Sequence, residues 1–361
     1  MRSGVLFGAM VIFGAVAMAT PAAAQADPCT ELGQYIDPNG DDLWTAPPSN
    51  AAALDAANRC IAARGGTANL YGIRAYIHRL MGNYSLADAD ATRRIEIDKS
   101  GNAYRNRAII RQTAGQHEQA VADFRESLRR GFNRPAWVHR ELAASLRQLD
   151  RFSEALAAVD TSVALDPTYD EALYERGLIF FEQERWDEAI GAFTRYIALN
   201  GSNAQAYVYR STSFIRLERW NDALADAERA IQINPRSANG FNNRGYALHN
   251  LGRYGESIAA FRRSTQLEPE NSSAWDNLCS YLTDANDPAG ALVACDRRES
   301  LPGVTGEDRA RVSSFRGLAH EALGETPNAI RAFRAALSNP DAHAVTRARA
   351  EAGLLRLGFR N

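Results

Sequence analysis

Residues able to carry chemistry are present in this chain, but they do not form the common catalytic patterns. The sequence HEQAV at His117 lacks the second histidine of a zinc-protease motif. The chain has no G-x-S-x-G elbow, no phosphate-binding glycine loop and no C-x-x-C pair. We therefore expect no catalytic residue, no metal site, no cofactor and no enzymatic activity.

Arginine and aspartate recur at one fixed spacing. Six arginines share a position in a repeated segment: Arg74, Arg107, Arg176, Arg210, Arg244 and Arg316. An aspartate follows at a second shared position in three of these segments: Asp90, Asp123 and Asp226. Where Leu142 or Leu278 replaces the arginine, Ala158 or Ala294 replaces the aspartate. This association favours structural ion pairs over an anion-binding stripe, and the other three arginines must find different partners.

The spacing of these pairs belongs to a longer repeat of 34 residues, in which Trp186, Trp220 and Tyr254 share one position. With Ala204 as position 1, the marker residues are Arg210 at 7, Phe214 at 11, Ala223 at 20, Ala230 at 27 and Pro235 at 32. One period later stand Arg244, Gly245, Leu248, Ser257, Phe261 and Pro269. Small residues at fixed positions let two helices approach closely, while large ones fill the space between helix pairs.

These markers resemble the tetratricopeptide repeat family. The resemblance implies an all-α fold, a right-handed superhelical solenoid of helix hairpins. We expect a signal peptide over residues 1–24, then an irregular segment with a half-repeat helix over 25–67. Eight repeats follow over 68–341, and a capping helix over 342–361.

The capping helix is needed because each repeat leaves an apolar side exposed until a neighbour covers it. Asn339 and Pro340 indicate its N-cap and first residue, and the helix is expected to continue to about Leu357. Its apolar stripe is expected to consist of Ala344, Ala348, Ala352 and Leu355.

Four cysteines form two candidate pairs. Cys279 and Cys295 fall at repeat positions 8 and 24, at equal distances from the hairpin turn, so they can be bridged. Cys29 and Cys60 would tie the irregular segment to the half-repeat helix. Two disulfides are favoured, and the alternative for each pair is buried free thiols.

Members of the family hold ligands in a groove lined by the first helix of each repeat. One such helix carries polar or amphipathic residues at all six lining positions: Asn239, Asn242, Asn243, Tyr246, His249 and Asn250. Asp276 and Asn277 continue this row, and Trp137, Tyr174 and Phe181 line earlier repeats. Asn offers both a donor and an acceptor to an extended backbone, and Tyr offers an apolar face. A solvated groove without ligand is the alternative for each residue.

The carboxylate clamp of some family members is missing. That clamp needs a basic residue, then Asn four residues later, then Asn in the next repeat. Here Arg105 is followed by Ile109 and Glu141. Arg140 likewise lacks both asparagines, so recognition of chaperone tails by this clamp is not expected.

The first residues indicate export. Arg2 precedes an apolar run from Val5 to Ala19, and Ala22 and Ala24 fit a cleavage site after Ala24. No later apolar run is long enough to span a membrane. A net charge of −2 argues against nucleic-acid binding.

Two functions remain open. The first is a periplasmic or secreted scaffold that binds a protein or peptide partner in its concave groove, in a role such as envelope assembly. The second is a glycan-binding or enzyme-associated module that uses the same Tyr and Asn lining. The identity of the partner does not follow from the residues.

Overall fold

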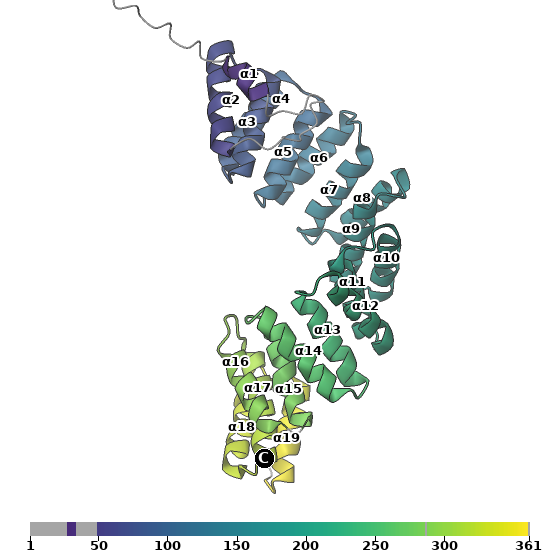
Figure 1. Cartoon of the computed structure of the whole chain (residues 1–361), viewed down its shortest axis with the longest axis vertical. Coiled ribbons are helices and arrows are strands. Elements are labelled where there is room, and N and C mark those ends of the chain that lie inside the picture. Colours follow the sequence, from purple (N-terminus) through teal and green to yellow (C-terminus); the bar gives the residue numbers. More distant parts are fainter. Residues whose placement is uncertain (1–26, 34–48, 286, 360–361) are drawn as a thin grey trace, which may run out of the picture. The chain divides into compact units, whose positions relative to one another are not determined.

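The computed structural model describes residues 27–33, 49–285 and 287–359, and every regular element in these ranges is a helix (Figure 1). The chain forms an all-α helical-repeat solenoid, as predicted. The predicted signal peptide and most of the irregular segment lie outside the described residues.

The chain divides into two compact units, 1–132 and 133–361. The first contains α1 (Pro28–Gly33), α2 (Asn50–Arg64), α3 (Ala68–Leu80), α4 (Tyr84–Ile97), α5 (Gly101–Thr113) and α6 (His117–Arg129). The second contains α7 (Pro135–Arg147), α8 (Phe152–Leu165), α9 (Asp170–Glu182), α10 (Trp186–Leu199), α11 (Ala204–Arg216), α12 (Trp220–Ile233), α13 (Ala238–Asn250), α14 (Tyr254–Leu267), α15 (Ser272–Asp284), α16 (Pro288–Glu299), α17 (Gly306–Ala322), α18 (Thr326–Ser338) and α19 (Ala344–Arg356). The repeat pattern did not indicate this division.

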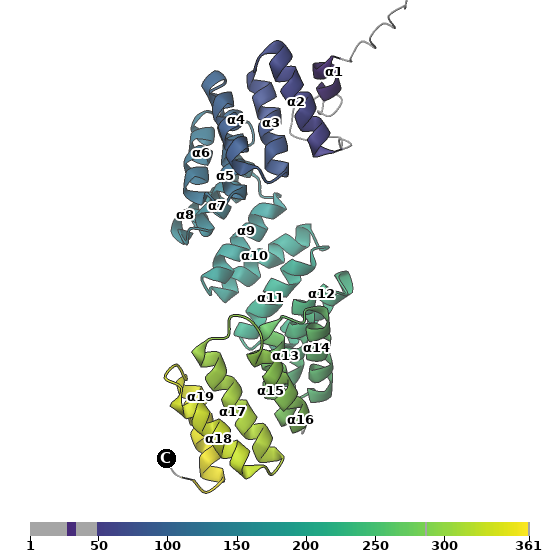
Figure 2. The same ribbon diagram turned by 90° about the vertical axis from the view of Figure 1, so that its left-hand side faces the viewer.

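Consecutive helices pack as hairpins, from α3 with α4 to α17 with α18. Within the second unit, the first helices α9, α11, α13 and α15 also contact one another in sequence (Figure 2). These first helices therefore form a continuous face of the second unit, and this face positions the candidate site.

Close packing inside a hairpin depends on a small residue opposite a large one. A Cβ added to Gly245 of α13 would lie 2.7 Å from the ring of Phe261 on α14. Gly177 meets Phe193 in the same way in the α9–α10 hairpin. Gly317 and Phe333 repeat this contact in the α17–α18 hairpin, so three hairpins bury a phenylalanine ring against the backbone of their first helix.

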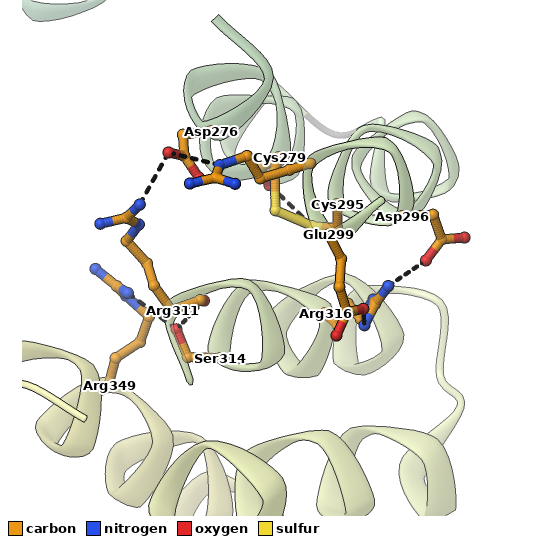
Figure 3. Close-up of a disulfide and its surroundings, with 10 residues drawn as sticks. Asp276, Cys279, Cys295, Asp296, Glu299, Arg311, Ser314, Arg316 and Arg349 are labelled. Carbon is orange, nitrogen blue, oxygen red and sulfur yellow. Dashed lines mark hydrogen bonds and ion pairs between the residues drawn. A yellow bond between two sulfur atoms is a disulfide. The ribbon is translucent and has the colours of Figure 1, made fainter. Parts of the chain in front are cut away.

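A disulfide occupies the equivalent place in the α15–α16 hairpin (Figure 3). Cys279 and Cys295 are fully buried and their Cα atoms lie 4.7 Å apart. The second disulfide joins Cys29 of α1 to Cys60 of α2, with Cα atoms 4.9 Å apart. Both cysteine pairs expected from the sequence are therefore bonded, and the free-thiol alternative is wrong.

The prediction for the last helix is wrong in two respects. Asn339 is the C-cap of α18, and α19 begins at Ala344 after His343. Arg347 explains the delay, because its guanidinium donates to the carbonyl oxygens of Leu337, Asn339 and Ala342 and so holds the connection open.

The buried stripe of α19 is also shifted around the helix. It consists of Thr346, Ala350, Gly353 and Leu354. The expected stripe faces outward instead: Ala344, Ala348, Ala352 and Leu355 are exposed. The buried face therefore lies on the opposite side of the helix from the expected stripe, and α19 leaves apolar side chains uncovered.

Candidate functional site

A cavity of about 600 Å³ opens on the first-helix face of the second unit. Its lining comes from α9, α11, α13 and α15, together with Trp220 at the start of α12. We call it the α9–α15 cavity. The lining residues are Phe181, Gln205, Val208, Tyr209, Thr212, Ile215, Arg216, Glu218, Trp220, Asn239, Asn242, Asn243, Tyr246, Ser273 and Asn277.

One wall of the cavity is made of amides. Asn277 Nδ2 on α15 donates to Asn242 Oδ1 on α13 across 3.0 Å. Within the described residues, Asn242 Nδ2 and Asn277 Oδ1 have no hydrogen-bond partner. Because both side chains line the cavity, the pair offers a ligand one donor group and one acceptor.

Asn243 has a structural role despite lining the same cavity. Only 7 % of its surface is exposed, and Nδ2 donates to Val208 O at 3.1 Å and to Thr212 Oγ1 at 2.9 Å. These two bonds fasten α13 to α11. Asn243 therefore bonds to the preceding repeat.

The cavity lining also contains aromatic rings. Phe181 of α9 and Tyr209 of α11 meet edge to face, with ring centroids 5.0 Å apart. Trp220 and Tyr246 form a second, tilted pair at 6.1 Å. Rings held by ring contacts lose little conformational freedom when they bind an apolar group.

The rim of the cavity carries both signs of charge. Arg216 and Glu218 are exposed there. Glu218 lies in the turn after α11 with φ at 57°, in the left-handed region that glycine occupies in other hairpin turns, such as Gly252. A non-glycine residue in that region costs about 1–2 kcal/mol, so this turn is locally strained.

Three residues expected in the groove lie outside the cavity lining. His249 stacks on Tyr281 with ring centroids 3.6 Å apart. Asn250 Nδ2 donates to Tyr246 O within its own helix. Asp276 belongs to a buried ion cluster.

The ion cluster around Asp276 involves three helices (Figure 3). Arg298 of α16 is 5 % exposed and contacts Asp276 at 3.1 Å and Asp308 at 3.0 Å. Arg311 of α17 donates to Asp276 at 2.8 Å and to Asp308 at 2.6 Å. Burial raises the pKa of Asp276, although the charges of both arginines oppose that shift. The Asp276 carboxylate is therefore engaged in packing α15 against α16 and α17.

Two further expected residues lie elsewhere in the second unit. Trp137 lines a separate cavity of about 250 Å³ with Arg134, Leu165 and Tyr169. Tyr174 packs against Phe193, Tyr196 and Tyr209, and burial raises the pKa of its hydroxyl. Neither residue lines the α9–α15 cavity.

Several lining residues were missed in the sequence. Gln205, Tyr209 and Thr212 stand on α11 at the positions that lining residues occupy on α13. The same 34-residue shift that selected the α13 row would have found them. Trp220 was read only as a repeat marker, although its ring also borders the cavity.

The arginine column is structural, as predicted for three pairs. Arg74, Arg107 and Arg210 each donate two hydrogen bonds to Asp90, Asp123 and Asp226 respectively. The remaining three arginines also have acidic partners: Arg176 pairs with Asp160, Arg244 with Glu228, and Arg316 with both Asp296 and Glu299.

Among the described residues, no group of His, Cys, Asp and Glu side chains is placed to hold a metal ion. In the same part of the chain, no helix has the length and apolar character required to cross a bilayer.

Comparison with known proteins supports the repeat assignment. Two models, both described as tetratricopeptide repeat, match residues 142–213 and 210–275. No curated protein matches the sequence significantly.

Solved structures share the fold at low sequence identity. PilW, described as a widely conserved type IV pilus biogenesis factor, is 18 % identical with a TM-score of 0.52, over 60 % of this chain and 99 % of its own. A tetratricopeptide repeat protein from Parabacteroides merdae is 16 % identical with a TM-score of 0.54, over 71 % of this chain and 99 % of its own. The C-terminal part of a repeat protein from Cytophaga hutchinsonii is 16 % identical with a TM-score of 0.52, over 63 % of this chain and 94 % of its own. The family-model matches identify tetratricopeptide repeats over residues 142–275, and the solved structures share the helical-repeat fold of this tetratricopeptide repeat protein.

Proposed function

We propose that this protein is a non-enzymatic scaffold that binds a protein or peptide partner in the α9–α15 cavity. The observation that carries the proposal is the Asn242–Asn277 pair, which leaves a donor and an acceptor facing the cavity beside aromatic rings. A peptide backbone needs such a donor and acceptor, and its side chains can bury apolar surface against the rings.

A glycan is the alternative ligand, because hydroxyl groups also bind amides and sugar rings also pack on aromatic faces. The ring geometry favours the peptide. Tyr246 is half-buried between Trp220 and Tyr281, so little of a flat face is offered for a sugar to cover.

The proposed location is the periplasm or the exterior of the cell, with a role in envelope assembly. The signal-like first residues and the two disulfides support export, since disulfides persist in oxidising compartments. PilW, a pilus biogenesis factor that shares the fold, makes an envelope role a reasonable one to test.

The experiment is a capture assay with the full chain immobilised. Wild-type protein is presented with envelope extract, with peptidoglycan and with a panel of soluble glycans. The same assay uses the triple variant Asn242→Ala, Tyr246→Ala, Asn277→Ala and a control, Asn221→Ala with Tyr254→Ala, at exposed residues away from the cavity. Protein capture that the triple variant loses and the control keeps supports the proposal. Capture of glycan alone would support the alternative.

A further inference from the structure

We infer that the α9–α15 cavity binds its peptide ligand in one chain direction. We also infer that it selects a ring-bearing side chain located C-terminal to the peptide residue that the amide pair binds. This inference rests on the proposed function and specifies its ligand. The peptide is extended, and it runs from α15 toward α11.

Direction follows from which amide group remains available on each helix. Asn242 on α13 keeps its donor group, and Asn277 on α15 keeps its acceptor. In an extended chain, the N–H and C=O of one residue point to the same side. The residue that satisfies both amides therefore turns its N–H to α15 and its C=O to α13. Since N precedes C along the chain, the peptide enters over α15 and leaves over α11.

Two aromatic rings lie on the exit side of the amide pair. Tyr209 on α11 and Phe181 on α9 lie beyond α13 in the direction that the peptide takes. Neighbouring helices pack about 8–10 Å apart and an extended residue spans about 3.3 Å, so the ring of Tyr209 meets a side chain about three residues after the held residue.

The surroundings of that position select a ring. Phe181 and Tyr209 both line the cavity and meet edge to face, with ring centroids 5.0 Å apart. A Phe, Tyr, Trp or Pro side chain makes contacts with this pair that a short or charged side chain does not. Ser273 on α15 and Asn239 on α13 keep the entrance polar, so the apolar selection is confined to the exit side.

The test begins with a random twelve-residue peptide library displayed on phage and selected on the full chain. We expect the selected peptides to share one ring-bearing residue. Replacing it with Ala should weaken binding at least tenfold, and so should Tyr209→Ala in the protein. The two losses should not add, because both changes remove the same contact. Asn221→Ala should bind the selected peptides as the wild type does.

Direction is measured with a benzophenone group placed at either end of a selected peptide. The N-terminal label should form crosslinks to residues 272–322, which cover α15 to α17, and the C-terminal label to residues 170–216, which cover α9 to α11. Exchanged ends would overturn the direction, and additive losses or peptides without rings would overturn the ring selection.

The outcomes also separate this inference from the proposed function. Selected peptides that need Asn242 and Asn277 but carry no shared ring would leave the scaffold function standing and refute only the ring selection. A library that yields no peptide dependent on the cavity residues would contradict both. Thermal melting monitored by circular dichroism identifies any variant that has failed to fold. If Tyr209→Ala fails to fold, Tyr209→Leu serves as the ring deletion, and Tyr209→Phe, which keeps the ring, serves as its control.

Discussion

Arg210 and Asp226 face each other across the α11–α12 hairpin, where Nε and Nη2 of the guanidinium each donate to one carboxylate oxygen over 2.7 Å. Arg74 with Asp90 and Arg107 with Asp123 repeat this geometry in the first unit. A two-bond pair fixes the relative height of two helices, so these arginines set the register of their hairpins rather than a binding surface.

Replacing Asp226 with Ala should destabilise the protein by about 2–3 kcal/mol, because the largely buried Arg210 loses its counter-charge. Asp222→Ala is the matched control, since its pair with Arg219 is half exposed and should be worth less than about 1 kcal/mol. Urea unfolding of both variants measures the difference. Equal losses in the two variants would contradict a structural role for the column.

Replacing Cys279 and Cys295 together with Ala should lower the free energy of unfolding by about 3 kcal/mol, as loop closure over 16 residues predicts. Peptide mapping without reductant should first recover the two bonded pairs, 279 with 295 and 29 with 60. Free thiols or a different pairing in protein isolated from the native cell would show that the bonds do not form there.

Replacing either of two neighbouring asparagines on α13 with Ala should affect stability differently. Asn243→Ala should cost about 1–2 kcal/mol, because it deletes two hydrogen bonds in a buried place. Asn242→Ala should leave the melting temperature unchanged or raised, since Ala is the better helix former, and should weaken ligand capture. Loss of stability in the second variant without loss of capture would mean that the amide pair serves packing alone.

His78 should make the first unit sensitive to acid. Burial lowers the pKa of its imidazole, with the charge of Arg74 acting in the same direction and that of Asp90 against it. A depressed histidine pKa contributes stability above about pH 6.5 that is lost as pH falls through the folded value. Wild type should therefore lose more stability between pH 7.5 and 5 than His78→Gln, by up to about 1.4 kcal/mol per pH unit for one proton. Parallel losses in the two proteins would contradict this.

The repeat period was sufficient to predict the helix hairpins and some of the contacts inside them. Arg210 with Asp226 and Cys279 with Cys295 follow from their repeat positions, because the hairpin geometry places the two positions of each pair opposite each other. The first residue of α19 could not be predicted from the repeat period. It depends on hydrogen bonds from Arg347 to three backbone carbonyls in and beside the connection before α19, which is not part of the repeat.

The candidate site was only partly predictable. Repeat position predicts which face of the helix a side chain lies on. It does not predict which of several nearby partners the side chain will bond to. Asp276 forms an ion pair with Arg298 and does not line the cavity. Arg298 occupies a repeat position where the pattern has alanine. The side chain of Asn243 donates hydrogen bonds to Val208 and Thr212. The amide NH₂ group of Asn242, one residue earlier, remains available to a ligand in the cavity.

The most direct test of the central claim is photo-crosslinking in the native cell from a benzophenone side chain placed at Gln205. This residue is exposed and lines the α9–α15 cavity, so the label samples whatever occupies it. Asn221, exposed on α12, carries the label in the control. We predict a discrete protein or peptide adduct from position 205 that is absent from 221 and is lost when Asn242, Tyr246 and Asn277 are all replaced with Ala. Adducts that form equally at both positions, or that persist in the triple variant, would contradict a peptide-binding role for this cavity.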